Sequence, residues 1–254
     1  MNVLVRFQTI KDNDKAAVVR KLMQSSTPDF DFFYLVGLSV LMATLGLLLD
    51  STSIVIGSML LAPLMYPILG VALGLVMSNG AVLTRSSITL FKSFLIGLVL
   101  SILAAVLFGD SASYMTHEVL VRTQPDLVHF VVAVVAGLAV SFALAQPEWS
   151  ETLPGIAISV ALIPPLATIG VGVAALDIAI VSGAVVLLTI NLIGIIFAAM
   201  VSFSLMNLYQ KQNVASSTIK KEDEKMKEEK KIMAEIEEDQ KNNKEAGNKN
   251  DYHA

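Results

Sequence analysis

Residues 88–109 read ITLFKSFLIGLVLSILAAVLFG and carry a single charge, Lys92. About 20 consecutive apolar residues are enough for a helix to cross the hydrocarbon core of a bilayer. Lipid offers no hydrogen-bond partners, so a spanning segment of this kind must be helical. Five more segments have the same character: 32–49, 54–78, 127–146, 154–176 and 178–207. The sequence therefore predicts an all-α integral membrane protein with six transmembrane helices.

The charged residues are concentrated outside these segments. They make up 16% of the 254 residues, against about 25% in ordinary soluble domains. Only 11 lie within residues 31–208, whereas the tail, 211–254, holds 21. This distribution excludes a single soluble globular domain, and we find no basic patch large enough to bind a nucleic-acid duplex. The expected partner of the body is the lipid bilayer.

The sequence offers little catalytic or metal-binding chemistry. It has no cysteine, and no two of its histidines, His117, His129 and His253, stand at a metal-ligand spacing. A thiolate nucleophile and a cysteine-based metal site are therefore excluded. No Asp, Glu, His, Lys or Arg lies at the centre of an apolar segment, which argues against a proton relay or a voltage sensor. We expect no enzyme activity, no cofactor and no bound metal.

Lysine and arginine residues set the expected orientation, because cytoplasmic loops carry an excess of them. Six crossings would place the N-terminal arm, the loop after the second segment and the C-terminal tail on one side. Together with Lys92, just inside the third segment, these regions hold 17 of the 18 Lys and Arg residues, and Arg122 in the loop 110–124 is alone on the other side. The sequence thus predicts a multi-pass protein of the cell membrane with both termini in the cytoplasm.

The two halves of the membrane body resemble each other at a nearly constant offset. Pro28-Asp29 precedes the first apolar segment, and Pro125-Asp126 precedes the fourth, 97 residues later. Each half holds three apolar segments, so the second copy enters the membrane upside down, as in many secondary transporters. We therefore predict a 3+3 inverted repeat formed by residues 28–109 and 125–208.

Prolines lie near the middle of the second and fifth segments, at Pro63 and Pro67 in one and at Pro164 and Pro165 in the other. A proline inside a helix removes one donor and clashes with the carbonyl four residues back. We predict two proline-broken helices, related by the offset of 102 between Pro63 and Pro165. Simple kinks are the alternative. Paired breaks in inverted halves favour a binding site at the membrane midplane.

The predicted substrate site lies between these two helices. Carbonyls freed by the prolines are acceptors for a cation or a hydroxyl donor, whereas the N-termini of half-helices favour an anion. The sequence leaves the sign of the charge open. The candidate residues are Ser58, Met59, Pro63, Tyr66, Val160, Ala161, Pro165, Thr168 and Asn191.

Two polar regions flank the membrane body. The N-terminal arm, 1–27, has apolar residues at helical spacing over 12–25, which predicts a short amphipathic helix at the cytoplasmic surface. The tail, 209–254, has Glu and Lys at three- and four-residue spacing, which favours a solvated segment that is partly helical or disordered. A self-association helix and a docking segment are the alternatives, which leaves a homo-oligomer open.

The run STSIVIGSMLLAPLMYPI, residues 51–68, resembles the hydrophobic bacterial and archaeal proteins called domain of unknown function 389. Pro28-Asp29, the run ETLPG at 151–155 and the run ALIPP at 161–165 support the resemblance. It covers about residues 28–207. The resemblance implies an integral membrane protein and no established activity. Longer members of the family carry an extra N-terminal soluble portion, which is absent or vestigial here.

The predicted function is a transporter or permease for an ion or small solute, because of the inverted repeat and the paired proline breaks. An oligomeric ion channel would use the same elements, and a flux that does not saturate would reveal it. A receptor or scaffold acting through the charged tail is the third hypothesis. Deleting the tail would abolish the function of a scaffold, whereas a transporter would keep its flux.

Overall fold

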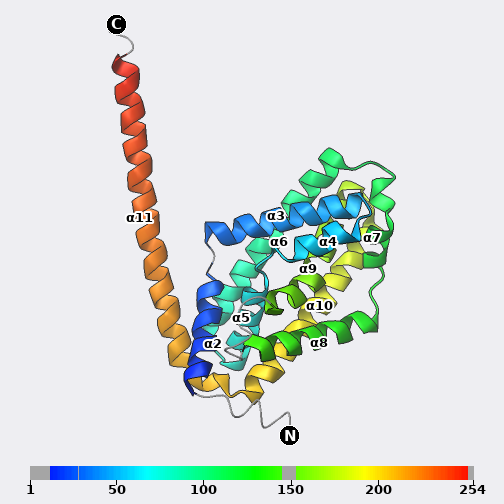
Figure 1. Ribbon diagram of the computed structural model, residues 1–254, viewed down its shortest axis with the longest axis horizontal. Coiled ribbons are helices and arrows are strands. Elements are labelled where there is room, and N and C mark those ends of the chain that lie inside the picture. The colour runs from blue at the N-terminus through cyan, green and yellow to red at the C-terminus, as the bar shows by residue number, and fades with distance from the viewer. Residues whose placement is uncertain (1–11, 28, 145–152, 251–254) are drawn as a thin grey trace.

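The computed structural model describes residues 12–27, 29–144 and 153–250, and it describes their side chains except in 153–161, 230 and 234–250. Within these residues the chain is helical and has no strand (Figure 1). Four helices are long and apolar enough to cross a membrane: α3 (Phe30–Leu48), α6 (Gly80–Phe108), α8 (Leu127–Leu144) and α10 (Ile178–Leu205). The prediction of an all-α membrane protein is thereby confirmed.

The other helices of the described residues lie within, between and outside these four. α4 (Thr52–Met59), α5 (Met65–Val76) and α9 (Leu153–Ala174) pack among the four long helices. Three short helices connect α6 to α8: η1 (Ser113–Met115), α7 (His117–Leu120) and η2 (Val121–Thr123). Outside the body lie α2 (Asp12–Ser25), η4 (Leu208–Lys211) and α11 (Gln212–Asn250).

The segment predicted over 54–78 is two helices, α4 and α5, separated by the irregular stretch 60–64. Pro63 has no N–H to donate to the Met59 carbonyl, its partner in a regular helix. The last turn of α4 instead closes with tighter bonds, from the Leu60 N–H to the Gly57 carbonyl at 3.3 Å and from the Leu61 N–H to the Ser58 carbonyl at 3.2 Å.

The fifth segment, predicted to be broken by proline, is the continuous helix α9, with Pro164 and Pro165 inside it. The fixed φ of proline suits a helix. Each proline nevertheless removes one N–H donor, and its ring clashes with the carbonyl four residues back. The carbonyls that lose a donor are those of Val160 and Ala161, and other carbonyls of α9 accept additional bonds from hydroxyl groups. Here the Thr168 hydroxyl donates to the Pro164 carbonyl at 2.9 Å. Ser101 of α6 donates to the Ala167 carbonyl, also at 2.9 Å.

One end of the body, which we call the tail end, is where α2 and α11 pack together beside α5 and α6 (Figure 1). Gln212 donates to the Met77 carbonyl at 2.9 Å. Arg85 pairs with Asp223 and donates to the Thr27 hydroxyl at 3.2 Å. These contacts bind the first three turns of α11 to the body, and beyond them α11 extends away from it (Figure 1).

The helix predicted over 12–25 is α2, and its apolar side chains contribute to the tail end. Val19, Leu22 and Met23 are fully buried or nearly so, and α2 packs against α5, η4 and α11. Lys211 lies 2.9 Å from the carboxylate of Asp12, and this hydrogen bond and charge lower the pKa of Asp12. The apolar face of α2 is therefore covered by protein.

The other end of the body, which we call the loop end, is covered by α7 and η2. The Thr116 hydroxyl donates to the Leu47 carbonyl at 2.8 Å, at the end of α3. The N–H of Glu118 donates to the carboxylate of Asp50 at 2.8 Å. Asp50 has a left-handed φ of 51° and lies in the turn between α3 and α4. Through these two hydrogen bonds, that turn and the loop before α8 hold each other in place.

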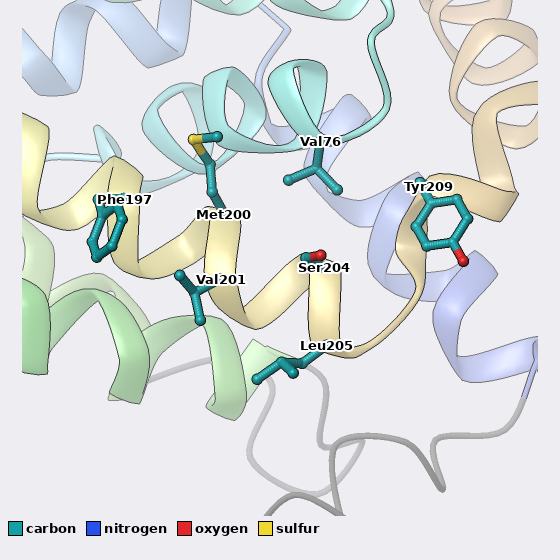
Figure 2. Close-up of a pocket in the computed structure, with 7 residues that line it drawn as sticks. All are labelled: Val76, Phe197, Met200, Val201, Ser204, Leu205 and Tyr209. Atoms are coloured by element: carbon teal, nitrogen blue, oxygen red, sulfur yellow. The ribbon is translucent and has the colours of Figure 1, made fainter.

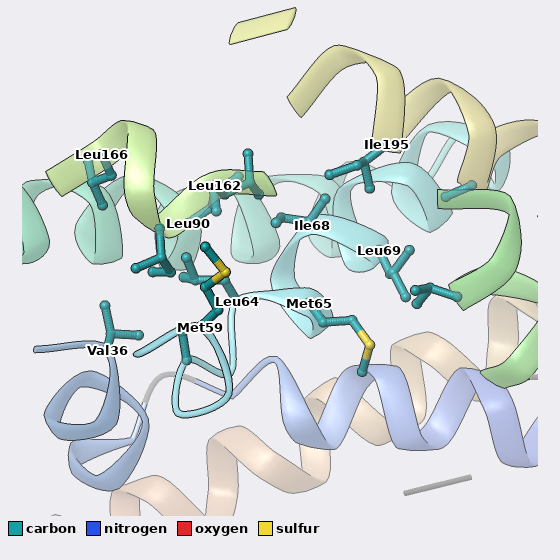
Figure 3. Packing of buried hydrophobic residues seen from close by; sticks show 14 of the residues in the cluster. Val36, Met59, Leu64, Met65, Ile68, Leu69, Leu90, Leu162, Leu166 and Ile195 are labelled. Atoms are coloured by element: carbon teal, nitrogen blue, oxygen red, sulfur yellow. The ribbon is translucent and has the colours of Figure 1, made fainter. Parts of the chain in front are cut away.

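The core gathers around the irregular stretch between α4 and α5 (Figure 3). Met59, just before this stretch, and Leu64, at its end, lie with Leu90 of α6 and Leu162 of α9 in one buried cluster. Outward-facing apolar side chains are exposed on α6 and α8, with Val106 at 60% and Val135 at 59%. An exposed apolar surface of this extent fits contact with lipid tails.

Candidate functional site: a cavity at the loop end

A cavity of about 350 Å³ lies between α8, α9 and α10, and η2 and the last residue of α4 complete its wall. Ligand sites in proteins typically measure about 300–1,000 Å³ and set a few polar groups in apolar walls. We call this space the loop-end cavity. Its lining residues are Met59, Val121, Arg122, Val128, His129, Val132, Ala133, Ala136, Pro164, Pro165, Leu187 and Asn191.

The loop-end cavity reaches from the surface into the middle of the body. His129 lies in the first turn of α8. Asn191 lies 13 residues beyond Ile178, the start of α10, which is about 20 Å along a helix that rises 1.5 Å per residue. Met59 and Asn191 are only 5% and 6% exposed. These two residues and the prolines of α9 form the floor of the cavity.

Three of the residues predicted for the site line this cavity: Met59, Pro165 and Asn191. They come from α4, α9 and α10, so the structure brings together groups that are far apart in the sequence. Asn191 is the polar member, and its amide holds both donors and an acceptor. The carbonyl of Met59 adds an acceptor to which Pro63 cannot donate.

Two of the predicted hydroxyl residues, Ser58 and Thr168, do not line the cavity. Ser58 is fully buried and donates to the Val55 carbonyl at 2.6 Å. Thr168 is fully buried and donates to the Pro164 carbonyl. Ser and Thr in membrane helices commonly bond to their own backbone in this way, so both hydroxyl groups are occupied within their own helices and are removed from the site.

Four other predicted residues are not part of the cavity lining as described. Pro63 and Tyr66 do not line it, and Tyr66 packs half-buried against the core. The backbones of Val160 and Ala161 belong to α9, but their side chains lie outside the described residues. The prediction that these two residues belong to the site therefore stays a prediction.

The mouth of the cavity holds two nitrogen-bearing side chains that the predicted site did not include, Arg122 and His129. The Arg122 guanidinium pairs with the Glu118 carboxylate at 2.7 Å. The Nδ1 atom of His129 accepts from the Asp126 N–H at 3.2 Å. Arg122 had one signal in the sequence, because it is the single Lys or Arg residue expected on its side of the membrane.

Comparison with known proteins places the chain in a family. The model of the family described as "Domain of unknown function (DUF389)" matches residues 59–197, more than half of the chain. The protein belongs to this DUF389 family. The matched range includes all twelve residues that line the loop-end cavity.

One relative of this DUF389 protein is an uncharacterized protein of Methanocaldococcus jannaschii, 29% identical over 167 residues. The match covers 66% of this chain and 51% of the relative, so the chain spans about half the length of the curated relative it matches. No solved structure matches the chain.

Glu118 determines where the Arg122 side chain of the DUF389 protein lies. It is 8% exposed, and its Oε1 accepts from the Thr52 hydroxyl at 2.5 Å. Its other carboxylate oxygen lies against Arg122, and its N–H is held by Asp50. A nearly buried carboxylate fixed on three sides gives Arg122 a defined position at the cavity mouth.

Glycines bring α8 and α10 close enough to form one wall of the cavity. A Cβ added to Gly137 of α8 would lie 2.9 Å from the Ile195 carbonyl oxygen of α10. A Cβ added to Gly194 of α10 would lie 2.9 Å from the Cβ of Ala133, which lines the cavity. Small residues allow this close approach of membrane helices. The wall between α8 and α10 is therefore rigid backbone.

Figure 2 shows a second cavity, of about 460 Å³, at the tail end of α10. Its walls come from α5, α10 and η4, and its polar groups are the hydroxyls of Ser204 and Tyr209. No charged side chain lines it, and it contains none of the residues predicted for the site. The loop-end cavity is therefore the better candidate for recognising a polar ligand.

Proposed function

We propose that this DUF389 protein is a membrane transporter for a small solute or ion, which binds in the loop-end cavity. The observation that carries the proposal is the position of that cavity. It extends from the loop end to a floor in the middle of the body, where Met59 and the polar Asn191 meet the prolines of α9. A site of this kind suits the midplane binding of secondary transporters.

The turns between helices support an inverted repeat. The N–H of Asn79 donates to the Gly74 carbonyl at 3.0 Å, and the N–H of Asp177 donates to the Gly172 carbonyl at 3.0 Å. Asn79 caps the start of α6, and Asp177 caps the start of α10 in the same way. The residue before each cap is left-handed, with a φ of 50° in the first turn and 56° in the second.

This shared turn changes the alignment within the second and fifth segments. It relates Gly74 to Gly172, an offset of 98, which is close to the 97 found elsewhere in the repeat. Pro165 then corresponds to Pro67 rather than to Pro63. Helix packing follows the same relation, because α3–α6, α5–α6 and α6–α9 have the counterparts α8–α10, α9–α10 and α10–α5.

Under this proposal α4 and α5 together form one crossing and α9 another, which gives six. The loop end then faces the outside of the cell membrane, and both termini lie in the cytoplasm. Since the cavity opens at the loop end, the structure corresponds to an outward-open state. Alternating access would require the same floor to open toward the tail end.

Cysteine accessibility tests the site, because the chain has no native cysteine. We expect Asn191→Cys to react with a membrane-impermeant thiol reagent added outside intact cells. Ala199→Cys is the matched control, because Ala199 lies two turns further along α10 and is 0% exposed. If Asn191→Cys is folded and as unreactive as the control, the cavity does not open to the outside and the proposed site is wrong.

Uptake by proteoliposomes tests the function. We expect saturable uptake of at least one solute from a panel of ions and small organic molecules, and loss of that uptake on labelling Asn191→Cys. A flux that does not saturate would indicate the channel. Truncation after Met226 removes only the part of α11 beyond the tail-end contacts, so a transporter keeps its uptake and a scaffold loses its function.

A further inference from the structure

The mouth of the loop-end cavity presents hydrogen-bond donors. The Nδ1 atom of His129 accepts from the Asp126 N–H, so in the neutral ring the proton resides on Nε2. His129 therefore offers an N–H at its other ring atom. This assignment follows from the geometry of the hydrogen bond.

Arg122 adds further donors to the same mouth. Its ion pair with the Glu118 carboxylate and its hydrogen bond to the Glu118 backbone carbonyl both use the Nη1 group. A guanidinium has five N–H donors in a planar fork, so the remaining edge is suited to a planar, bidentate acceptor. Two side chains of one cavity lining that both donate favour a ligand group that only accepts.

The walls below the mouth are apolar. Val132, Ala133, Ala136 and Leu187 line them. His129 and Ala136 are seven residues apart on α8, which corresponds to a depth of about 10 Å. A second charged group on the ligand would be desolvated against these walls without a partner, and burying an unpaired charge is very costly.

From these features we propose that the loop-end cavity binds a small monocarboxylate with an apolar body. Its carboxylate would accept from Arg122 and the Nε2–H of His129, and its apolar part would lie against Val132, Ala136 and Leu187. This inference rests on the proposed function and assigns a substrate class to the same site. The size of the cavity suits an aromatic or short aliphatic acid, and the apolar walls select against dicarboxylates.

Binding of benzoate to the purified protein tests the proposal, with benzamide as a neutral isostere and succinate as a dianion. A ligand of the folded state raises the apparent thermal stability in proportion to its occupancy. We expect benzoate to stabilise the protein, and to do so at concentrations at least about tenfold lower than benzamide or succinate, since one charge-assisted bond accounts for a factor of this order. Equal effects of benzoate and benzamide would overturn the proposal.

Two variants locate the binding. Arg122→Gln should weaken benzoate binding by at least about tenfold, whereas Arg122→Lys, which keeps the charge and loses the fork, should fall between it and the parent. Lys92→Gln is the matched control, because it also removes one positive charge but its exposed side chain does not line the cavity. Circular dichroism verifies that each variant is folded. Unchanged affinity in both Arg122 variants would refute the carboxylate site.

The accessibility of position 191 separates this inference from the proposed function. If Asn191→Cys reacts from outside and benzoate neither binds nor slows that reaction, the monocarboxylate assignment is wrong while the transport site stands. If Asn191→Cys does not react, the cavity itself is wrong, and both proposals fail. Protection of Asn191→Cys by benzoate, and not by benzamide, would support both.

Discussion

Gly183 of α10 offers the sharpest test of how the mouth of the cavity is built. A Cβ added at this position would lie 2.1 Å from the carbonyl oxygen of Thr123 and 2.8 Å from its Cα. Ordinary contact begins at 3.4 Å, so Gly183→Ala must displace the backbone of η2 by about 1.3 Å. Arg122 precedes Thr123 in η2 and would be displaced with it.

The expected change in the free energy of unfolding of Gly183→Ala follows from two opposing effects. Forcing extra volume into a packed contact typically costs about 1–3 kcal/mol, whereas alanine is better than glycine inside a helix by about 1 kcal/mol. Gly80→Ala serves as the control for glycine removal, because nothing lies within 4 Å of its added Cβ. Gly57→Ala is an interior control, whose nearest neighbour is the flexible end of Met42 at 3.1 Å. We expect Gly183→Ala to be less stable than both controls by about 1–3 kcal/mol.

Unfolding in detergent, followed by circular dichroism during titration with sodium dodecyl sulfate, measures these differences. The reactivity of a cysteine at position 191, introduced into the same three backgrounds, reports on the cavity. We expect this reactivity to change in the Gly183→Ala background alone. If Gly183→Ala matches the controls in both measurements, η2 does not pack on α10, and the assignment of Arg122 to the cavity mouth is refuted.

Three further outcomes follow from the tail end and the topology. Arg85→Gln removes the ion pair with Asp223. Since the Asp223 side chain is 45% exposed, we expect the free energy of unfolding to fall by at most about 1 kcal/mol. We also expect proteolysis of α11 to be faster in this variant than in Lys92→Gln. The pKa of Asp12 is lowered, so its contact with Lys211 should be fully formed at pH values above the ordinary pKa of Asp and should disappear as the pH falls through the lowered pKa. We expect proteolysis of α11 to become faster over that pH range, and Asp12→Asn should abolish this pH dependence. A cysteine replacing Ser216 should be inaccessible from outside intact cells and one replacing Ser111 accessible, whereas the reverse pattern would invert the proposed orientation.

The long helices were predictable because their signal is local. A run of about 20 apolar residues must satisfy its backbone internally in lipid, whichever helices surround it. The behaviour of prolines is not local in this sense. Two adjacent prolines leave α9 continuous, where Thr168 and Ser101 supply hydrogen bonds to nearby carbonyls. Pro63 instead lies in an irregular stretch between helices. The sequence shows the missing donors in both segments but not which of the two segments stays helical.

The candidate site was predictable in part for a similar reason. Asn191 stood out as the most polar side chain within an apolar run, and Met59 and Pro165 lie next to or within the proline motifs. Arg122 and His129 precede or open α8, and only the packing of η2 against α10 brings Arg122 to the same cavity as Asn191. Ser58 and Thr168 were good candidates by residue type, but local hydrogen bonds to their own helices occupy both hydroxyl groups.

The proposed two-fold relation also explains why one half carries the cavity. At the offset of 97, Asn191 corresponds to Phe94 and Ala133 corresponds to Val36. In the first half, therefore, larger apolar side chains stand where the second half has a small residue and an amide, and Val36 is fully buried in the core. Opening toward the tail end would have to move these apolar side chains apart without providing a second amide. The polar floor formed by Asn191 would then serve both states, so a single ligand position, rather than two equivalent sites, is what an inverted repeat with this sequence can support.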